Sequence, residues 1–280
     1  MREPLARVAL TCLLLGAQAQ SAAAERIVSI GGAATEILFA LGVDAQVIAV
    51  DSTSLFPAAA DALPDVGYLR QLSAEPILAQ RPDLVLYEAD AGPPEALAHL
   101  AAAGVPLVRI LDEPSPAGVA AKIRAVAAAV GQVAEGERLA QALEREMRAL
   151  GTELATYSVR PAVLFALQID AGAVLAAGRG TAADAIIALA GGRNVADFDG
   201  YKPMAGEALM VAAPDYVLTM DRAVTGFTPP QAALALPVLA HTPAAAAGRL
   251  VVMDGLLLLG FGPRLGLAAR ELAAALHPFE

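Results

Sequence analysis

The stretch from Pro116 to Thr156 constrains the fold most, because it has helical periodicity and almost no strand signal. It is broken once, at Gly131, and the part from residue 135 to residue 154 is rich in strong helix formers. A flexible linker would instead be rich in Gly, Ser or Pro. The stretch therefore predicts a stiff helix that joins two lobes and permits only limited hinge motion.

On both sides of this stretch, short β-branched runs alternate with longer segments rich in Ala and Leu. The alternation predicts β/α units with a largely parallel sheet. We expect strands at 27–30, 46–50, 84–87, 107–110, 163–168, 216–220 and 250–254. We expect helices at 33–41, 75–80, 94–103, 181–190, 207–212 and 264–276. The predicted fold class is α/β, with two Rossmann-like lobes at 25–115 and 158–280 and a helical connection at 116–157 that includes the long interlobe helix.

An internal repeat relates the two lobes. Residues 67–86 and 200–218 follow one plan, in which a Gly-Tyr loop leads to a helix that opens with a glutamate, Glu75 or Glu207, and a Pro-Asp turn then enters a buried strand. Turn chemistry and helix capping explain each copy but not their matching order. The repeat predicts two related lobes that face each other across a cleft.

The first residues have the three parts of a secretory signal peptide, which we assign to residues 1–24. They have a positively charged start, an apolar stretch at 8–17 and small residues at 21–24. The chain's one cysteine, Cys12, lies inside the apolar stretch. The mature chain is therefore expected to lack disulfides, thiolate metal sites and a cysteine nucleophile.

Charge and motifs exclude several classes of function. The formal net charge is −10 and no run of Lys or Arg occurs, which argues against nucleic acid or an anionic membrane surface as partner. No stretch after residue 25 approaches the roughly 20 apolar residues of a membrane span, so we expect no direct membrane insertion, and we expect a monomer. A doubly wound enzyme would need a Gly-x-Gly-x-x-Gly loop, a Gly-x-Ser-x-Gly elbow or a P-loop, and the sequence has none of them. We therefore predict that the protein is not an enzyme.

Four motifs carry a resemblance to a known family. Residues 26–42 resemble the opening of the periplasmic binding proteins that serve vitamin B12, siderophore and haem importers. Residues 67–75, 177–184 and 261–264 look like the haem-binding members. The resemblance implies a class III periplasmic binding protein that captures haem in the interlobe cleft and delivers it to an ABC-type importer for iron acquisition.

The resemblance also implies roles for particular residues. In the haem-binding members the tyrosine of the first motif ligates iron, and the match falls on Tyr68. Ferric iron is a hard acid and phenolate is a hard oxygen donor, so the pairing is chemically sensible. Arg70 is expected to favour the phenolate or to bind a haem propionate. Tyr201 and Lys202 occupy the repeat position opposite Tyr68, where they could close over the far haem face.

Further residues complete the expected haem site. Arg179 and Arg264 follow glycine-rich turns, where they could meet propionates. Some family members carry a histidine where this chain has Gln168, so the obvious second iron ligand is missing and we predict one haem per chain. The matching family glutamates contact arginines of the two membrane-spanning permease subunits, which assigns permease docking to Glu75 and Glu207.

Two alternatives share the predicted fold. A ferric siderophore or a corrinoid would be expected to use aromatic or multi-arginine pockets, whereas this chain has no Trp and only 4% aromatic residues. Zinc or manganese binding would need clustered imidazole and carboxylate ligands. The three histidines, His99, His241 and His277, are instead scattered along the chain.

Overall fold

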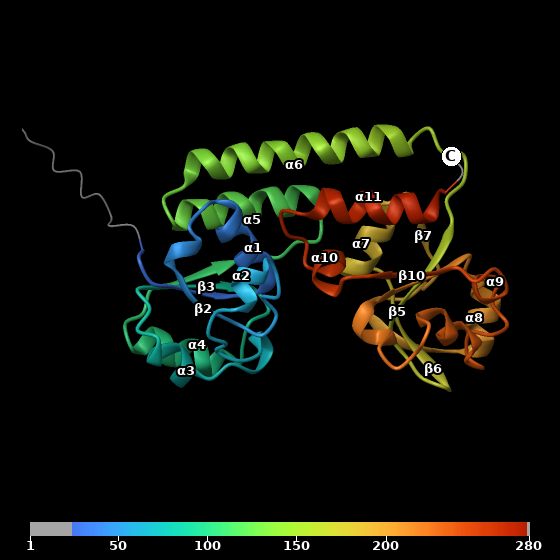
Figure 1. Ribbon diagram of the computed structural model, residues 1–280, viewed down its shortest axis with the longest axis horizontal. Helices are drawn as coiled ribbons and strands as arrows, with labels where there is room; N and C mark the ends of the chain where they lie inside the picture. Colours follow the sequence, from blue (N-terminus) through green and yellow to red (C-terminus); the bar gives the residue numbers. More distant parts are fainter. Residues whose placement is uncertain (1–23, 279–280) are drawn as a thin grey trace, which may run out of the picture.

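The computed structural model describes residues 24–278. They form two lobes that lie side by side along a long helix (Figure 1). That helix is α6 (Val133–Leu154), and α5 (Pro116–Ala129) and α11 (Leu265–Leu276) lie end to end beneath it. Helices α5 and α6 pack closely, because a Cβ on Gly136 would lie 2.2 Å from the Cβ of Ala127. The expected helix at 135–154 lies within α6. The predicted signal peptide falls almost wholly outside the described residues.

The N-terminal lobe is built on a four-stranded parallel sheet. Its strand order is β2 (Val47–Val50), β1 (Ile27–Ile30), β3 (Leu84–Glu88) and β4 (Leu107–Ile110). Alternate residues of a strand point to opposite faces, so Ile27 packs in one core cluster with residues of α1 (Gly32–Ala40) and α5. Its neighbour Val28 packs in another cluster with residues of α3 (Ala74–Ala79) and α4 (Pro94–Ala102). The sheet is therefore covered on both faces.

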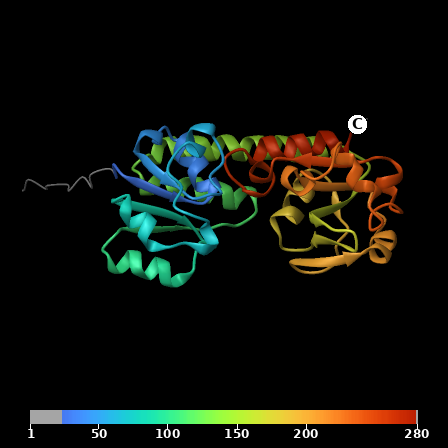
Figure 2. The same cartoon turned by 60° about the horizontal axis from the view of Figure 1, so that its bottom comes forward.

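The C-terminal lobe has a mixed sheet rather than a parallel one throughout. Strands β10 (Leu250–Met253), β9 (Tyr216–Met220) and β5 (Ala162–Ile169) are parallel, and β7 (Arg193–Asn194) also pairs in parallel with β5. Strands β6 (Ala173–Ala177) and β8 (Tyr201–Ala205) extend the sheet in the antiparallel direction, as Figure 2 helps to follow. The remaining helices are α2 (Ala58–Asp61), α7 (Ala182–Leu189), α8 (Gly206–Ala212), α9 (Pro243–Ala246) and α10 (Gly255–Leu259).

The expectation of a loop at Tyr201 was wrong, because this residue begins β8. The strand lies at the edge of the sheet and is mostly exposed, so its sequence carries no alternation of apolar and polar residues. Pro203 lies within it, and proline in a sheet is tolerated mainly on edge strands. Hydrophobic periodicity alone therefore does not predict β8.

The internal repeat is confirmed in the backbone. Arg81 and Ala213 occupy the same place in the two copies, and both have left-handed conformations, with φ of 51° and 45°. The next aspartates also match in their contacts. Asp83 accepts a hydrogen bond from the backbone N–H of Arg26 (3.1 Å) beside β1, and Asp215 accepts one from the first N–H of β5 (2.8 Å). Each lobe therefore ties its repeat helix to its central strand in the same way.

An ion pair links the two lobes directly. Arg264, at the start of α11, donates through Nε (2.8 Å) and Nη2 (2.5 Å) to the two carboxylate oxygens of Glu36 in α1. The guanidinium carbon of Arg264 lies 3.6 Å from the centre of the Phe56 ring. Burial raises the pKa of Glu36, and the hydrogen bond from Arg264 offsets only part of that rise. We call the contacts of Arg264 with Glu36 and Phe56 the interlobe clasp.

A buried lysine makes a second connection between the lobes. The side chain of Lys122 in α5 is fully buried, and its Nζ donates to the backbone carbonyl of Phe261 (3.1 Å) and to Asp112 (2.6 Å). Phe261 has a φ of 45°, which is unusual for a bulky residue. A charged nitrogen without partners would be costly at this depth, so Lys122 holds the loop before α11 against the N-terminal lobe.

Replacing Arg264 by Met should lower the free energy of unfolding by about 2–3 kcal/mol, because it leaves the buried Glu36 carboxyl without its partner. The matched control is Arg179→Met, whose partners Asp197 and Asp199 are 90% and 83% exposed. That control should change stability by less than about 1 kcal/mol. Urea unfolding curves of both variants test this, and equal effects of the two substitutions would contradict it.

Candidate functional site

A cleft of about 410 Å³ lies between the lobes. Its walls come from the carboxyl ends of the parallel strands, which is where ligands bind in open α/β sheets. Its apolar surface includes Leu55 and Leu69 on one lobe and Leu256 and Leu259 on the other. Its polar side chains from the N-terminal lobe include Arg70, Glu88, Asp90 and Asp112, and those from the C-terminal lobe include Tyr201, Asp221, Arg222 and Asp254.

Arg70 lines this cleft and contacts Tyr68, which is not among the described residues that line it. Arg70 Nη1 donates to the phenol oxygen of Tyr68 at 2.8 Å. Arg70 also donates to the Asp90 carboxylate, which fixes the guanidinium in the wall. The Tyr68 side chain stays 40% exposed. Tyr68 is therefore exposed to solvent while its phenol oxygen accepts a charge-assisted hydrogen bond from Arg70.

Tyr201 faces the same cleft from the opposite lobe. Burial raises its pKa, while the positive charge of Arg70 acts in the opposite direction, so the two side chains are close enough to interact. Lys202 is the next residue of β8, and strand alternation directs it to the other face of the sheet. There its Nζ lies 5.5 Å from the centre of the Phe198 ring. The cleft wall therefore includes Tyr201 and not Lys202.

Three other residues that the sequence suggested for this site are engaged elsewhere. Arg264 forms the interlobe clasp. Arg179 forms ion pairs with Asp197 and Asp199. Gln168, near the end of β5, donates to Asp170 at 3.0 Å. None of these three residues is among the described residues that line the cleft.

Arg222 is a cleft residue that the sequence reading missed. It follows β9 by two positions and lines the cleft opposite Arg70. Its Nη2 lies 3.7 Å from the sulfur of Met220, and none of the ion pairs within residues 24–278 involves it. Its place after the carboxyl end of a parallel strand was the signal that could have found it.

Glu88 is the most deeply buried titratable group of the cleft wall. It accepts a hydrogen bond from the backbone N–H of Ala34 at 2.9 Å, at the start of α1. Burial raises its pKa to about 7. The positive charge of Lys122 and the Ala34 hydrogen bond lower the pKa, while Asp112 and Asp90 raise it. Burial is therefore the main cause that brings the pKa of Glu88 close to neutrality.

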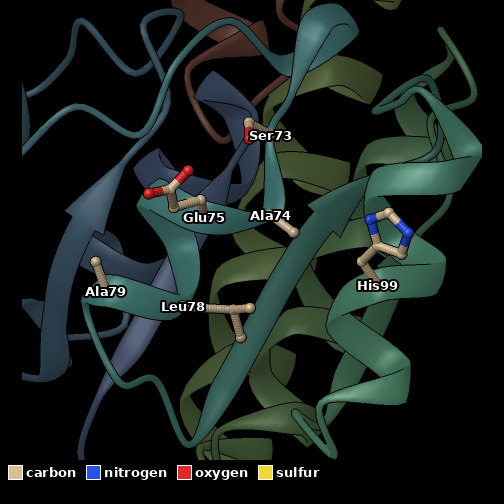
Figure 3. Close-up of a pocket in the computed structure, with 6 residues that line it drawn as sticks. All are labelled: Ser73, Ala74, Glu75, Leu78, Ala79 and His99. Atoms are coloured by element: carbon tan, nitrogen blue, oxygen red, sulfur yellow. The ribbon is translucent and has the colours of Figure 1, made fainter.

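The repeated glutamates lie outside the cleft, each beside a shallow hollow. Glu75 lines a hollow of about 630 Å³ with Leu78 and His99. Figure 3 shows Leu78 on the side of α3 that faces His99, and the Glu75 carboxylate pointing away from His99. Glu207 lines a hollow of about 530 Å³ with Met210 and His241. Helices α3 and α8 both lie in the parts of the lobes remote from α6 (Figure 1). Glu75 and Glu207 are both exposed.

The histidines do not gather with other ligands. His99 and His241 are exposed, and His277 is buried with its ring centre 4.8 Å from that of Tyr157. Within residues 24–278, no group of three or more His, Cys, Asp or Glu side chains could hold a metal ion. In the same range, no helix is both long enough and apolar enough to cross a membrane.

Comparisons with known proteins agree with this architecture. A sequence profile described as "Periplasmic binding protein" matches residues 27–256. The periplasmic heme-binding protein BhuT in complex with two hemes superimposes with a TM-score of 0.85 at 43% identity, covering 90% of this chain and 98% of that one. The apo form of the periplasmic heme-binding protein RhuT from Roseiflexus sp. RS-1 gives a TM-score of 0.85 at 42% identity, covering 91% and 98%.

Curated relatives match over a shorter length. The vitamin B12-binding protein of Yersinia pseudotuberculosis is 35% identical over 104 residues. This match covers 37% of the present chain and 37% of that relative. It therefore supports a shared fold element more than a shared ligand.

Glu88→Gln should weaken the pH dependence of stability between about pH 4.5 and pH 7. In that range the folded protein retains the Glu88 proton and the unfolded chain has released it, so the parent loses up to about 3 kcal/mol as the pH rises. The raised pKa of Glu36 acts in the same direction, so part of the dependence should remain. Urea unfolding at several pH values tests this, with Glu207→Gln as the same substitution at an exposed site. An unchanged profile in Glu88→Gln would contradict the assignment.

Proposed function

The chain belongs to the periplasmic binding protein family, and on that premise we propose that it binds haem in the interlobe cleft and delivers it to an ABC importer. The observation that carries the proposal is the phenol oxygen of Tyr68, which lies 2.8 Å from Nη1 of the cleft residue Arg70. Support comes from BhuT and RhuT, two periplasmic heme-binding proteins that match nearly their whole length at 43% and 42% identity.

Tyr68 supplies the iron ligand in this proposal. A phenolate is a hard oxygen donor that suits ferric iron, and tyrosine is an established axial ligand of haem iron. The hydrogen bond from Arg70 stabilises the negative oxygen and holds the ring in place. The partial exposure of Tyr68 leaves room for a flat ligand to approach from the cleft.

The remaining cleft surface fits the other parts of haem. The four leucines of the two walls offer an apolar surface to the porphyrin. Arg70 and Arg222 approach from opposite lobes, and guanidinium groups bind carboxylates well, so we assign the propionates to these two arginines. Tyr201 covers the far side of the ring. Lys202, Gln168, Arg179 and Arg264 have no assigned contact with haem, because their side chains contact residues outside the cleft lining.

We propose one haem per chain, although BhuT was solved with two. Gln168 stands where some family members carry a histidine, and its amide is held by Asp170. The proposed site therefore has a single iron ligand from the protein, Tyr68. A titration of the protein with haemin should break at one equivalent.

A corrinoid is the second candidate ligand, because curated relatives include vitamin B12-binding proteins. Those matches cover 37% of the chain, whereas the heme-binding structures cover at least 90%. Binding of cyanocobalamin, measured by calorimetry beside haemin, separates the two ligands.

Delivery rests on Glu75 and Glu207. We propose that each exposed carboxylate contacts a cationic side chain of one membrane-spanning permease subunit. The proposed location is the periplasm, reached through a signal peptide at residues 1–24 that is cleaved on export. The proposed role is binding and transport without catalysis.

Tyr68→Phe should abolish the tyrosinate spectrum of the ferric haem complex and weaken haem binding at least about tenfold, because it keeps the ring and removes the ligand oxygen. The matched control is Tyr201→Phe, which removes the phenol oxygen of the tyrosine that lines the cleft. That variant should keep the tyrosinate spectrum. Visible absorption and haemin titration test both, and a parental spectrum in Tyr68→Phe would exclude Tyr68 as the ligand.

The double variant Glu75→Arg and Glu207→Arg should keep its fold and haem spectrum but bind the importer at least about tenfold more weakly, because like charges then meet at both contacts. The readout is stimulation of ATPase activity by haem-loaded protein with an ABC haem importer of the same organism in nanodiscs.

The control for this docking test is a double variant with the same change of charge on the helical side of the molecule, Glu135→Arg and Glu271→Arg. It should stimulate as the parent does. Parental stimulation by the Glu75 and Glu207 double variant would remove the docking assignment, and lost haem binding would place these carboxylates in the cleft instead.

A further inference from the structure

Glu88 is a buried carboxyl of the cleft wall to which the proposed haem site gives no role. It ends β3, lines the cleft and is 8% exposed. Its side chain lies against the backbone of Gly31, because a Cβ on Gly31 would lie 2.4 Å from the Glu88 Cδ. Gly31 also has a φ of 116°, a conformation that favours glycine. A glycine at position 31 therefore leaves the space that this carboxyl occupies.

Another buried carboxyl of the same lobe shows what Glu88 lacks. Asp51 is 1% exposed and accepts four hydrogen bonds, two from backbone N–H groups and two from hydroxyls. Within residues 24–278, the Glu88 carboxyl accepts one hydrogen bond, from the N–H of Ala34, and forms no ion pair. Hydrogen bonds and opposite charges are what keep a buried carboxyl ionised. Glu88 therefore has few of the contacts that stabilise a charged form.

The charges around Glu88 compensate its own charge poorly. Lys122 acts on it from α5, but the Nζ of Lys122 donates to Asp112. Asp112 and Asp90 line the same cleft and disfavour a further negative charge on Glu88. Among the described residues that line the cleft, five carboxyls face two guanidinium groups. The other charged groups on the packed elements and across the cleft are Glu36 with its partner Arg264, Asp51, Arg70, Asp221, Arg222 and Asp254.

Haem in the cleft would strengthen both influences on Glu88. The single positive charge of the ferric porphyrin core is cancelled by a tyrosinate ligand, so the two propionates remain as added negative charge. The apolar ring also removes water from the cleft wall. A carboxyl that loses water or gains a negative neighbour holds its proton more tightly. Both changes therefore favour the neutral form of Glu88.

We propose that Glu88 is a proton-binding site of the cleft, and that a proton on Glu88 and haem in the cleft favour each other. This inference rests on the proposed haem binding and deepens it, because it names a group whose protonation regulates the affinity. The coupling is reciprocal. Burial brings the pKa of Glu88 to about 7, so both forms are populated near neutral pH. The contribution of Glu88 should therefore weaken haem binding as the pH rises through 7.

The test compares haemin binding by the parent and by Glu88→Gln, which keeps the shape of the side chain and fixes it in a neutral form. The variant should match the parent at pH 5.5 and bind about threefold to tenfold more tightly at pH 8.5, where only the parent carries the charge. Proton release from Tyr68 occurs in both proteins and cancels in the ratio of their dissociation constants. The matched control Glu95→Gln, at an exposed site on α4, should bind as the parent does at both pH values.

A ratio of dissociation constants that does not change with pH would overturn the inference. Carboxyl ¹³C NMR of the parent gives a second measurement that needs no variant, with gallium protoporphyrin as a diamagnetic substitute for haem. The titration midpoint of Glu88 should rise by about 0.5–1 in pH on loading, which is the same coupling as the threefold to tenfold change in affinity. An unchanged midpoint would also overturn the inference. A parent protein that binds no haemin would instead contradict the proposed function itself.

Discussion

The bond between Glu36 and Arg264 is the contact on which the geometry of the cleft depends. A carboxylate that is 3% exposed accepts two hydrogen bonds from a guanidinium in the other lobe, and Phe56 covers that guanidinium. Removing either partner would leave a buried group without compensation, so the contact favours one arrangement of the lobes. Helix α6, which joins the lobes, and the contact of Lys122 with Phe261 also favour this arrangement of the lobes. The cleft is thus largely formed before any ligand arrives.

A preformed cleft suits a rigid, flat ligand. Little ordering is required on binding when the walls already stand in place, so more of the contact energy appears as affinity. The two lobes contribute unlike parts: the Tyr68 and Arg70 pair comes from one, and Arg222 and Tyr201 come from the other. The proposed docking uses the opposite arrangement, since Glu75 and Glu207 come from matching positions of the repeat. In this proposal the matching positions of the repeat contact the partner, and the residues that differ between the lobes contact the ligand.

Local patterns predicted what local chemistry determines. The two Pro-Asp turns and the long helix are encoded within a few neighbouring residues, and both appear in the structure. The contact of Tyr68 with Arg70 spans two positions and was within reach of the sequence. Strand β8 could not be predicted from the sequence, because this exposed edge strand lacks the alternation of apolar and polar residues that marks a half-buried strand. Arg264 was expected at the ligand, but its partner Glu36 lies 228 positions away, and no local pattern records such a pairing.

The crystal structure of the haem-loaded protein is the most direct measurement of how this cleft works. We expect one haem between the lobes, with its iron bound to the Tyr68 oxygen and its propionates at Arg70 and Arg222. We also expect the clasp to be intact and the Cα atoms of both lobes to superimpose on the present structure within about 1 Å. Haem held away from Tyr68, or lobes rotated with the Glu36 and Arg264 pair broken, would contradict a preformed tyrosinate site.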